Sequence, residues 1–256
     1  MQSKSAQEPV IGIIGGMGPE ATVELMRRVI RRTPARDDSD HLRLLVDCNP
    51  KVPSRIAFLL EGGSVDPAPI LIEMAKGLQR QGATVLAIAC NTAHAFAEPI
   101  REAVDIPLVD ILEVSFAKLG GLVSTGPVVF GVLGSPALRR VGLLERRTSG
   151  SRLVAVHPDA EHEALALSLI RTVKAGETGD DVIRRYAALK QHLMARGAEH
   201  TLVCCTEFSI LEELQSPQQR ATLDTLDALV DALVTLASST LSSQSRAHHA
   251  TTRQDV

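Results

Sequence analysis

The chain has 256 residues, of which 45% are hydrophobic and 22% charged, an ordinary composition for a globular protein of one large or two small domains. Its 27 Lys and Arg against 30 Asp and Glu give a formal net charge of -3, so we expect no binding to nucleic acid or anionic lipid. With five Phe, one Tyr and no Trp, an aromatic platform for stacking bases is not expected either.

Targeting and redox signals favour a cytoplasmic protein. No apolar run approaches the roughly 18 residues of a membrane-spanning helix, and the polar N-terminus lacks the apolar region of a secretory signal. The four cysteines, Cys48, Cys90, Cys204 and Cys205, have neither zinc-ligand nor disulfide spacing. We therefore expect free thiols in a reducing compartment, no metal site and no membrane contact.

Short β-branched segments alternate with longer helical patterns, which predicts an α/β fold with parallel sheets. The predicted strands are Val10–Ile14, Leu42–Val46, Thr84–Ala89, Pro107–Val109, Val128–Leu133, Leu153–Val156 and Thr201–Cys204. The predicted helices are Pro19–Arg32, Pro67–Arg80, Thr92–Val104, Pro158–Lys174, Asp180–Arg196 and a closing helix, Leu223–Leu236. The closing helix is expected to pack back on the first part of the chain. Residues 242–256, rich in Ser and Thr, are predicted to form a disordered tail.

An internal repeat divides the chain. Residues Gly82–Thr92 (GATVLAIACNT) and Gly197–Glu207 (GAEHTLVCCTE) each follow a helical pattern, open with Gly and continue as a buried strand. Each segment places a cysteine eight residues after its Gly, Cys90 in the first and Cys205 in the second. The repeat predicts two pseudo-symmetric α/β lobes, each a parallel sheet flanked by helices, with the active site in the cleft between them. The predicted lobes comprise residues 9–113 plus 220–241, and residues 114–219.

Both cysteines follow the carboxyl ends of predicted parallel strands, where ligands bind in open α/β sheets. Each also stands just before the first turn of a helix, whose partial positive charge lowers a thiol pKa. Neighbouring Asn91, Thr92 and Thr206 could donate hydrogen bonds to a carboxylate bound in the same place. If the lobes face each other across a cleft, Cys90 and Cys205 reach opposite faces of one carbon, which is the arrangement of a two-base racemase.

Structural interpretations of these residues stay open beside the catalytic one. Free cysteines are common in cores, and Cys204, on the opposite face of its strand from Cys205, is expected to be one of them. Cys48 has no counterpart in the other lobe and is also assigned a structural role. His94, one helical turn after Cys90, is typical of a surface or capping residue, although a Cys–His nucleophilic pair would have the same spacing.

The segment GMGPEA, which begins at Gly16, satisfies a dinucleotide-binding fingerprint after a strand. Pro19 equally suits the first turn of a helix, so this short pattern alone does not establish nucleotide binding. The backbone amides around Met17 could instead hold a substrate carboxylate.

The motifs resemble the pyridoxal-phosphate-independent aspartate/glutamate racemase family, and within it the aspartate racemase branch. The matching segments are IGIIGGMGPEAT (Ile11–Thr22), NPKVPSR (Asn49–Arg55), ACNTAH (Ala89–His94), VKAG (Val173–Gly176) and CTEFSIL (Cys205–Leu211). Members of the family have two pseudo-symmetric lobes, use two cysteines as acid and base, and need no metal or cofactor. The resemblance therefore implies these roles for Cys90 and Cys205, an acidic amino acid as substrate, and a homodimer.

By the same resemblance, Arg55 and Lys174 lie near the substrate and attract its side-chain carboxylate. Three departures from the family pattern leave the preferred substrate open. Cys204 stands where the family usually has Gly, Ile56 where a Thr often follows the Arg, and the loop Gly134–Arg140 lacks a common Thr pair.

Three functional hypotheses follow. The first is a cofactor-independent racemase that interconverts L- and D-aspartate, or glutamate, by proton transfer between two cysteines and Cα. The second is a lyase or isomerase on the same scaffold, of the decarboxylase or maleate isomerase type, in which one cysteine acts. The third is a non-catalytic protein that closes its lobes on an acidic metabolite. The presence of both Cys90 and Cys205 favours the first hypothesis.

Overall fold

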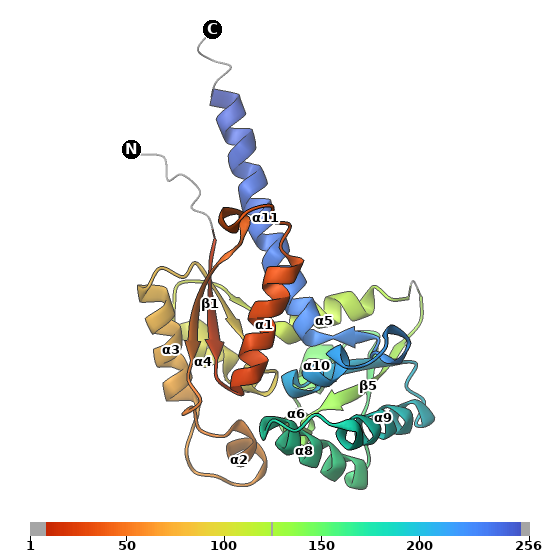
Figure 1. Ribbon diagram of the computed structural model, residues 1–256. Coiled ribbons are helices and arrows are strands. Elements are labelled where there is room, and N and C mark those ends of the chain that lie inside the picture. The colour runs from red at the N-terminus through yellow and green to blue at the C-terminus, as the bar shows by residue number, and fades with distance from the viewer. Residues whose placement is uncertain (1–8, 124, 252–256) are drawn as a thin grey trace.

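Two four-stranded parallel sheets, each flanked by helices, form the protein, and this confirms the predicted α/β fold class (Figure 1). The computed structural model describes residues 9–123 and 125–251, with side chains described as far as Ser238. The strand orders, β2-β1-β3-β4 and β6-β5-β7-β8, are equivalent in the two sheets. The duplicated order agrees with the repeat seen in the sequence.

The first sheet and its helices occupy the N-terminal part of the chain. The elements are β1 (Val10–Gly15), α1 (Pro19–Arg32), β2 (Arg43–Cys48), α2 (Arg55–Leu60), α3 (Ala68–Arg80), β3 (Val85–Ile88), α4 (Ala97–Ala103), β4 (Leu108–Val109) and α5 (Ile111–Gly120), with 3-10 turns at Asp38–Asp40 and Thr92–Phe96. The central strand β1 is buried throughout because helices cover both sheet faces, which explains its continuous apolar sequence.

The second sheet repeats this plan. Its elements are β5 (Val128–Gly134), α6 (Pro136–Arg140), α7 (Leu143–Thr148), β6 (Leu153–Val156), α8 (Ala160–Lys174), α9 (Asp180–Ala195), β7 (His200–Cys204), α10 (Thr206–Glu213), a 3-10 turn (Pro217–Gln219), β8 (Leu223–Asp224) and α11 (Thr225–Thr251). The seven strands predicted from the sequence all exist, with ends that agree to within one or two residues.

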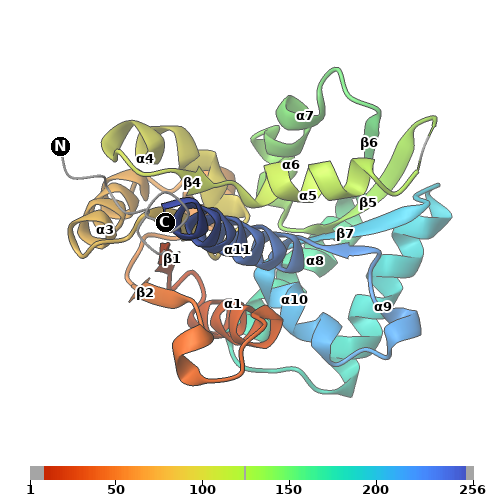
Figure 2. The same cartoon turned by 90° about the horizontal axis from the view of Figure 1, so that it is seen from above.

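A shared core joins the two sheets. Figure 2 shows α11 lying between α1 and α5, and α11 contacts both of these helices. One cluster of buried residues includes Ile11 of β1, Phe130 of β5 and Leu229 of α11. The predicted packing of the closing helix against the first part of the chain is confirmed by its contacts with α1.

A buried arginine adds an ionic connection beside this core. Arg28, on α1, is 5% exposed and forms ion pairs with Glu24 at 2.8 Å and Asp224 at 2.7 Å. Its Nη2 also donates to the backbone oxygen of Ser209, on α10, at 2.8 Å. Because Asp224 and Ser209 belong to the second sheet and its helix, Arg28 ties the first lobe to the second.

The closing segment differs from the prediction in two ways. Leu223 and Asp224 form β8 and pair with β7, so the last helix begins at Thr225 and residues 223–224 join the second sheet. The helix then extends to Thr251, so residues 242–251 are not the predicted disordered tail. Extending a packed helix costs far less than nucleating one, which lets a polar segment continue it. Residues 252–256 lie outside the described part of the chain.

The predicted helix Thr92–Val104 is also divided in two. A 3-10 turn, Thr92–Phe96, precedes α4. Pro99 lies in the first turn of α4. Proline has no N–H and clashes with the carbonyl four residues earlier, so a continuous helix cannot pass through it.

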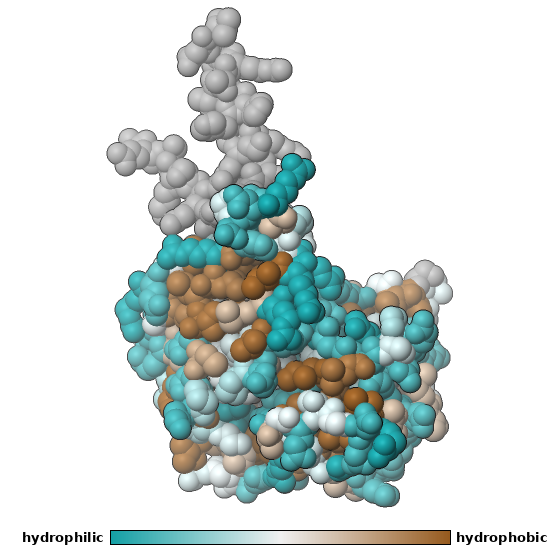
Figure 3. Space-filling view, viewed as in Figure 1, coloured by the Kyte–Doolittle hydropathy of each residue, from teal (hydrophilic) through white to brown (hydrophobic). Residues whose placement is uncertain are grey.

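The surface mixes polar and apolar areas. None of the helices in the described residues is long and apolar enough to cross a lipid bilayer. The face in Figure 3 shows apolar side chains gathered on the upper part of the first lobe beside a band of hydrophilic ones. On α1, Val23 and Ile30 are 48% and 52% exposed.

The Arg28 network leads to a stability prediction. Arg28→Ala leaves Asp224 buried without its cation, whereas Glu24 keeps its ion pair with Arg27 at 2.7 Å, so we expect the free energy of unfolding to fall by about 3–5 kcal/mol. The matched variant Arg31→Ala removes a side chain that is 61% exposed and should change it by less than about 0.5 kcal/mol. Urea unfolding followed by circular dichroism measures both. Equal unfolding midpoints for the two variants would contradict the bridging role of Arg28.

Candidate active site

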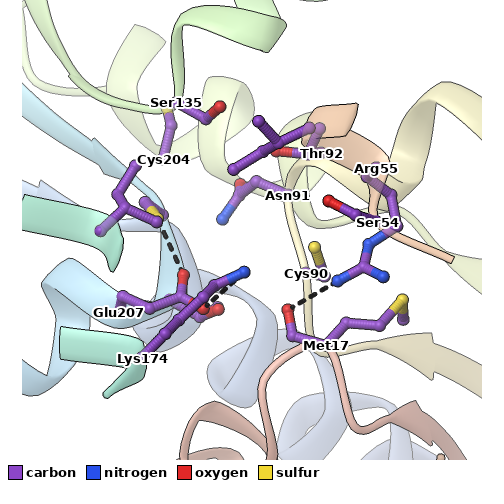
Figure 4. Close-up of a pocket in the computed structure, with 14 residues that line it drawn as sticks. Met17, Ser54, Arg55, Cys90, Asn91, Thr92, Ser135, Lys174, Cys204 and Glu207 are labelled. Atoms are coloured by element: carbon purple, nitrogen blue, oxygen red, sulfur yellow. Dashed lines mark hydrogen bonds and ion pairs between the residues drawn. The ribbon is translucent and has the colours of Figure 1, made fainter. Parts of the chain in front are cut away.

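A narrow pocket with a free volume of about 20 Å³ lies where the carboxyl ends of the two sheets face each other (Figure 4). All eight residues predicted to act on or bind substrate line it, together with six others. The lining residues are Met17, Ser54, Arg55, Ile56, Cys90, Asn91 and Thr92 from the first lobe, and Ser135, Ile170, Lys174, Cys204, Cys205, Thr206 and Glu207 from the second. The structure thus brings the predicted residues together, while their roles stay a prediction.

Cys90 follows β3 closely and is oriented by a contact to its backbone oxygen. The next turn places His94 so that its Nδ1 lies 3.0 Å from the backbone oxygen of Cys90, while the backbone N–H of Ile111 donates to Nε2 at 3.2 Å. Nε2 therefore accepts and Nδ1–H donates, which defines the tautomer. Burial lowers the pKa of His94 and keeps the ring neutral. Both ring nitrogens are used on backbone groups, so His94 orients Cys90 and is not paired with its sulfur.

Cys205 occupies the equivalent place after β7, as the N-cap residue of α10. It is 7% exposed, and its Sγ donates a hydrogen bond to Glu207 Oε2 at 2.9 Å. Burial raises the pKa of this thiol, the Glu207 carboxylate raises it further, and Lys174 partly opposes the rise. The lowered pKa predicted from the helix N-terminus is therefore wrong for Cys205, because burial and a carboxylate outweigh the helix dipole.

Glu207 is the site residue that sequence reasoning missed. It is 5% exposed and lies between Cys205 and Lys174, whose Nζ is 3.5 Å from Oε1. That contact is an ion pair without a hydrogen bond, since Oε1 has no donor among the described residues. The sequence does contain one signal. When the two repeat segments are aligned, they differ two residues after the cysteine, where the first has Thr92 and the second has Glu207.

Arg55 enters the pocket from the first turn of α2, which Ser54 caps by accepting a hydrogen bond from the backbone N–H of Ala57 at 3.1 Å. Its side chain is buried, with the residue 7% exposed. Nη1 donates to the backbone oxygen of Pro53 at 2.7 Å and Nη2 to that of Met17 at 3.4 Å. These bonds orient the guanidinium, and its Nε–H has no acceptor among the described residues.

Two hydrogen bonds connect the cysteine segments to the opposite side of the cleft. Asn91 Nδ2 donates to Thr225 Oγ1 at 3.0 Å, and Thr206 Oγ1 donates to the backbone oxygen of Ala89 at 3.4 Å. Asn91 and Thr206 directly follow Cys90 and Cys205 in the sequence, and Ala89 directly precedes Cys90. The relative position of Cys90 and Cys205 is therefore set by direct contacts as well as by the sheets.

Unpartnered polar atoms gather in this pocket. The described residues contain five buried side-chain N or O atoms without a hydrogen-bond partner, and three of them belong to Arg55, Asn91 and Glu207. Each such atom costs about 1–3 kcal/mol if it stays unpaired. Arg55 Nε is a donor that requires an acceptor, whereas Asn91 Oδ1 and Glu207 Oε1 are acceptors that require donors. A ligand with both a carboxylate and an ammonium group satisfies all three.

Of the two remaining cysteines, Cys204 lies in the core as predicted, whereas Cys48, which was assigned a structural role, is exposed. Cys204 borders the pocket, but its side chain is fully buried in the shared core, where burial raises its pKa. Cys48 is exposed at the end of β2 and does not line the pocket.

A wider cavity of about 410 Å³ adjoins the pocket and shares Met17, Ser54, Arg55, Lys174 and Glu207 with it. The loop after β1 lines its other side, and a Cβ added to Gly18 would stand 3.6 Å from Glu207 Oε1. This cavity forms an approach from solvent to the cysteines.

Comparisons with known proteins identify the family of this chain and agree with its two-lobed α/β fold. Residues 14–233 match the model of the family described as Asp/Glu/Hydantoin racemase. A broad specificity amino-acid racemase of Bacillus subtilis is 24% identical over 215 residues, which cover 81% of this chain and 89% of that protein. The aspartate racemase of Picrophilus torridus superposes with a TM-score of 0.76 at 24% identity, covering 90% of this chain and 94% of the other. Glutamate racemase of Francisella tularensis, solved with D-glutamate, gives 0.60 at 17% identity, with coverage of 90% and 80%.

The environment of Cys205 leads to a prediction about thiol reactivity. Iodoacetamide reacts with thiolates, so Cys205, with its raised pKa, should react slowly at neutral pH and faster as the pH rises. Glu207→Gln removes the negative charge beside the sulfur and should accelerate the reaction, by up to about tenfold for each pKa unit lost. Lys174→Met removes the opposing positive charge and should slow it. Peptide mass spectrometry measures the alkylation rate of each cysteine separately.

Exposed Cys48 provides an internal reference, since neither variant changes its surroundings. If Glu207→Gln and Lys174→Met shift the Cys205 rate in the same direction, the charges beside the sulfur do not set its protonation.

Proposed function

The chain belongs to the Asp/Glu/hydantoin racemase family and is an amino-acid racemase, and from that premise we propose that it interconverts L- and D-aspartate, or glutamate, with two cysteines and no cofactor. One observation carries the proposal: Cys90 and Cys205 enter a single pocket from opposite lobes, beside unpartnered atoms that complement an amino acid. A one-cysteine lyase or a non-catalytic binding protein would not need both sulfurs.

The proton transfer follows from the different surroundings of the two sulfurs. In one direction, Cys90 as thiolate removes the Cα proton and the Cys205 thiol delivers its own proton from the opposite face. This step leaves Cys90 as thiol, Cys205 as thiolate and the amino acid inverted. The raised pKa of Cys205 supports its role as the acid in this direction.

The opposite enantiomer requires Cys205 to act as the base. Glu207 Oε2 already accepts the Cys205 S–H hydrogen bond at 2.9 Å, so it is placed to receive that proton and leave a thiolate. The Cys90 thiolate takes up a proton from solvent and delivers it to the other face of Cα, and the proton on Glu207 returns to solvent at the end of the turnover. In this scheme Glu207 is the residue that lets a buried thiol with a raised pKa work in both directions.

Substrate binding follows the unpartnered atoms. Arg55 Nε–H is free to donate to a carboxylate, and Arg presents a planar fork suited to that group. Asn91 Oδ1 and Glu207 Oε1 are free to accept from the substrate ammonium group. With these contacts the Cα–H bond lies across the pocket, between the sulfurs of the two lobes. Met17, Thr92 and Thr206 complete the lining as proposed substrate contacts.

A second carboxylate on the substrate needs a second cation in a pocket partly closed to water. Lys174 supplies that charge from the second lobe, where its side chain is 35% exposed. The same Lys174 is paired with Glu207, which favours a second candidate range: neutral amino acids beside acidic ones. The similarity to a broad specificity racemase supports this alternative.

We also propose a cytoplasmic homodimer that takes a small acidic amino acid as its substrate and requires neither pyridoxal phosphate nor a metal for activity. The exposed Val23 and Ile30 on α1 supply apolar area of the kind that protein interfaces cover.

The catalytic pair is tested by four cysteine variants. Cys90→Ala and Cys205→Ala should each reduce aspartate racemisation to background, because one face of Cα then lacks the group that removes or delivers its proton. Cys48→Ala and Cys204→Ala are matched controls and should keep most activity, since neither sulfur is offered to the substrate. Polarimetry follows the loss of optical rotation. Full activity in Cys90→Ala or Cys205→Ala would sink the two-base mechanism.

Specificity is tested at the basic residues. Arg55→Ala should weaken transition-state binding of aspartate by about 2–5 kcal/mol, which is at least about 30-fold in kcat/KM, and should affect alanine far less. Lys174→Ala should act in the same direction more mildly. Arg171→Ala, on the same helix but 60% exposed, is the control. Equal racemisation of aspartate and alanine, unchanged by Arg55→Ala, would replace the acidic substrate by the broader range.

A further inference from the structure

A second cluster of chemically active side chains lies outside the pocket. Asp159 caps the N-terminus of α8, His162 lies in the first turn of the same helix, and His192 lies near the end of α9. The two helices are neighbours in the second lobe (Figure 1). Residues that are far apart in the sequence thereby meet at one place on the surface.

The three side chains converge closely. His162 Nδ1 lies 2.8 Å from Asp159 Oδ1, and His192 Nε2 lies 3.5 Å from Asp159 Oδ2. The two imidazole rings are stacked, with centroids 3.5 Å apart and planes 9° from parallel. One potential ligand atom from each residue lies within 4.8 Å of the others. Ligand atoms around a tetrahedral zinc with bonds of about 2.0–2.1 Å are about 3.3 Å apart, and the stacked rings must rotate about their side-chain bonds before both bring a nitrogen to one ion.

The protonation pattern also suits a metal. The backbone N–H of Asp159 donates to His192 Nε2 at 3.4 Å, so Nε2 is the unprotonated nitrogen of this ring, and a metal would take its lone pair in place of that long hydrogen bond. His162 Nδ1 becomes free to bind a metal when its proton is carried by Nε2 instead, a change of tautomer that keeps the ring neutral.

Neighbouring charges do not oppose a cation. Arg139 approaches the loop before α8 at the backbone oxygen of Pro158, but its guanidinium is paired with Glu163 at 2.8 Å. The side chains of Asp159, His162 and His192 are 44%, 25% and 15% exposed. A bound ion could therefore be reached from solvent and could keep a water ligand.

We propose that Asp159, His162 and His192 form a binding site for a divalent transition metal such as Zn²⁺, which would connect the beginning of α8 to the end of α9. Two imidazoles with one carboxylate select transition metals, whereas Ca²⁺ and Mg²⁺ prefer sites made only of oxygen. This proposal differs from the expectation from the sequence that the chain has no metal site. The cysteine spacing on which that expectation was based does not report a site made of His and Asp from two helices.

The site is separate from the reaction. α8 is 15 residues long and carries Lys174 of the pocket at its other end, about 22 Å away at about 1.5 Å per residue. The metal would therefore stabilise the α8–α9 pair of the second lobe without touching substrate. Metal binding at this site does not depend on the racemase mechanism.

Calorimetric titration of the metal-free full-length protein with Zn²⁺ tests the proposal. We expect one ion to bind at this site and the melting temperature to rise by roughly 5 °C when free Zn²⁺ exceeds its Kd a hundredfold. His162→Ala and His192→Ala should each weaken this binding at least tenfold, while their melting temperatures without metal show whether they fold. The control His248→Ala/His249→Ala keeps all three ligands and should bind as the wild type does.

Co²⁺ distinguishes this site from the cysteines. Ligation by nitrogen and oxygen gives visible absorption without the near-ultraviolet thiolate-to-cobalt band, and His192→Ala should abolish it. The proposal is overturned if wild-type protein binds no Zn²⁺ at millimolar concentration, if folded His162→Ala and His192→Ala bind with unchanged affinity, or if the cobalt spectrum shows thiolate ligation.

Discussion

The two cysteine segments are joined to each other across the cleft, and the geometry of the site depends on that connection. Thr206 donates to the backbone oxygen of Ala89, and Asn91 donates to Thr225 at the start of α11. Behind these bonds, the shared core and the buried Arg28 hold the two sheets together. Parallel strands direct their carboxyl ends to one edge, so two sheets joined in this way present their following residues to one pocket.

Within this symmetric frame the two sulfurs have different surroundings. Cys90 is oriented through its backbone by a neutral histidine, whereas Cys205 contacts a carboxylate through its sulfur. A two-base reaction starts with one thiol and one thiolate, and unequal surroundings favour one of the two arrangements of that proton. The Glu207 carboxylate makes the surroundings of the two sulfurs different. It also forms an ion pair with Lys174, whose positive charge would attract an acidic substrate.

The fold and most of the site could be predicted because they depend on short-range patterns. Buried parallel strands are continuous apolar runs, and the repeated Gly-to-Cys spacing is enough to identify Cys90 and Cys205 as equivalent positions of two lobes. Glu207 could not be found in this way, since its role arises from a side-chain contact with Cys205 and from burial. The cluster of Asp159, His162 and His192 has no sequence signal for a related reason: His162 and His192 meet only after α8 and α9 pack.

The central claim is that Cys90 and Cys205 act on opposite faces of one Cα atom. Racemisation of protiated L-aspartate in deuterated water, stopped at low conversion and analysed by chiral separation with mass spectrometry, tests it most directly. The account predicts that the D-aspartate formed carries one solvent deuterium at Cα while the remaining L-aspartate carries none, because different groups remove and deliver the proton. D-Aspartate that keeps its original proton at Cα would contradict it, since a single group would then have moved that proton between the faces.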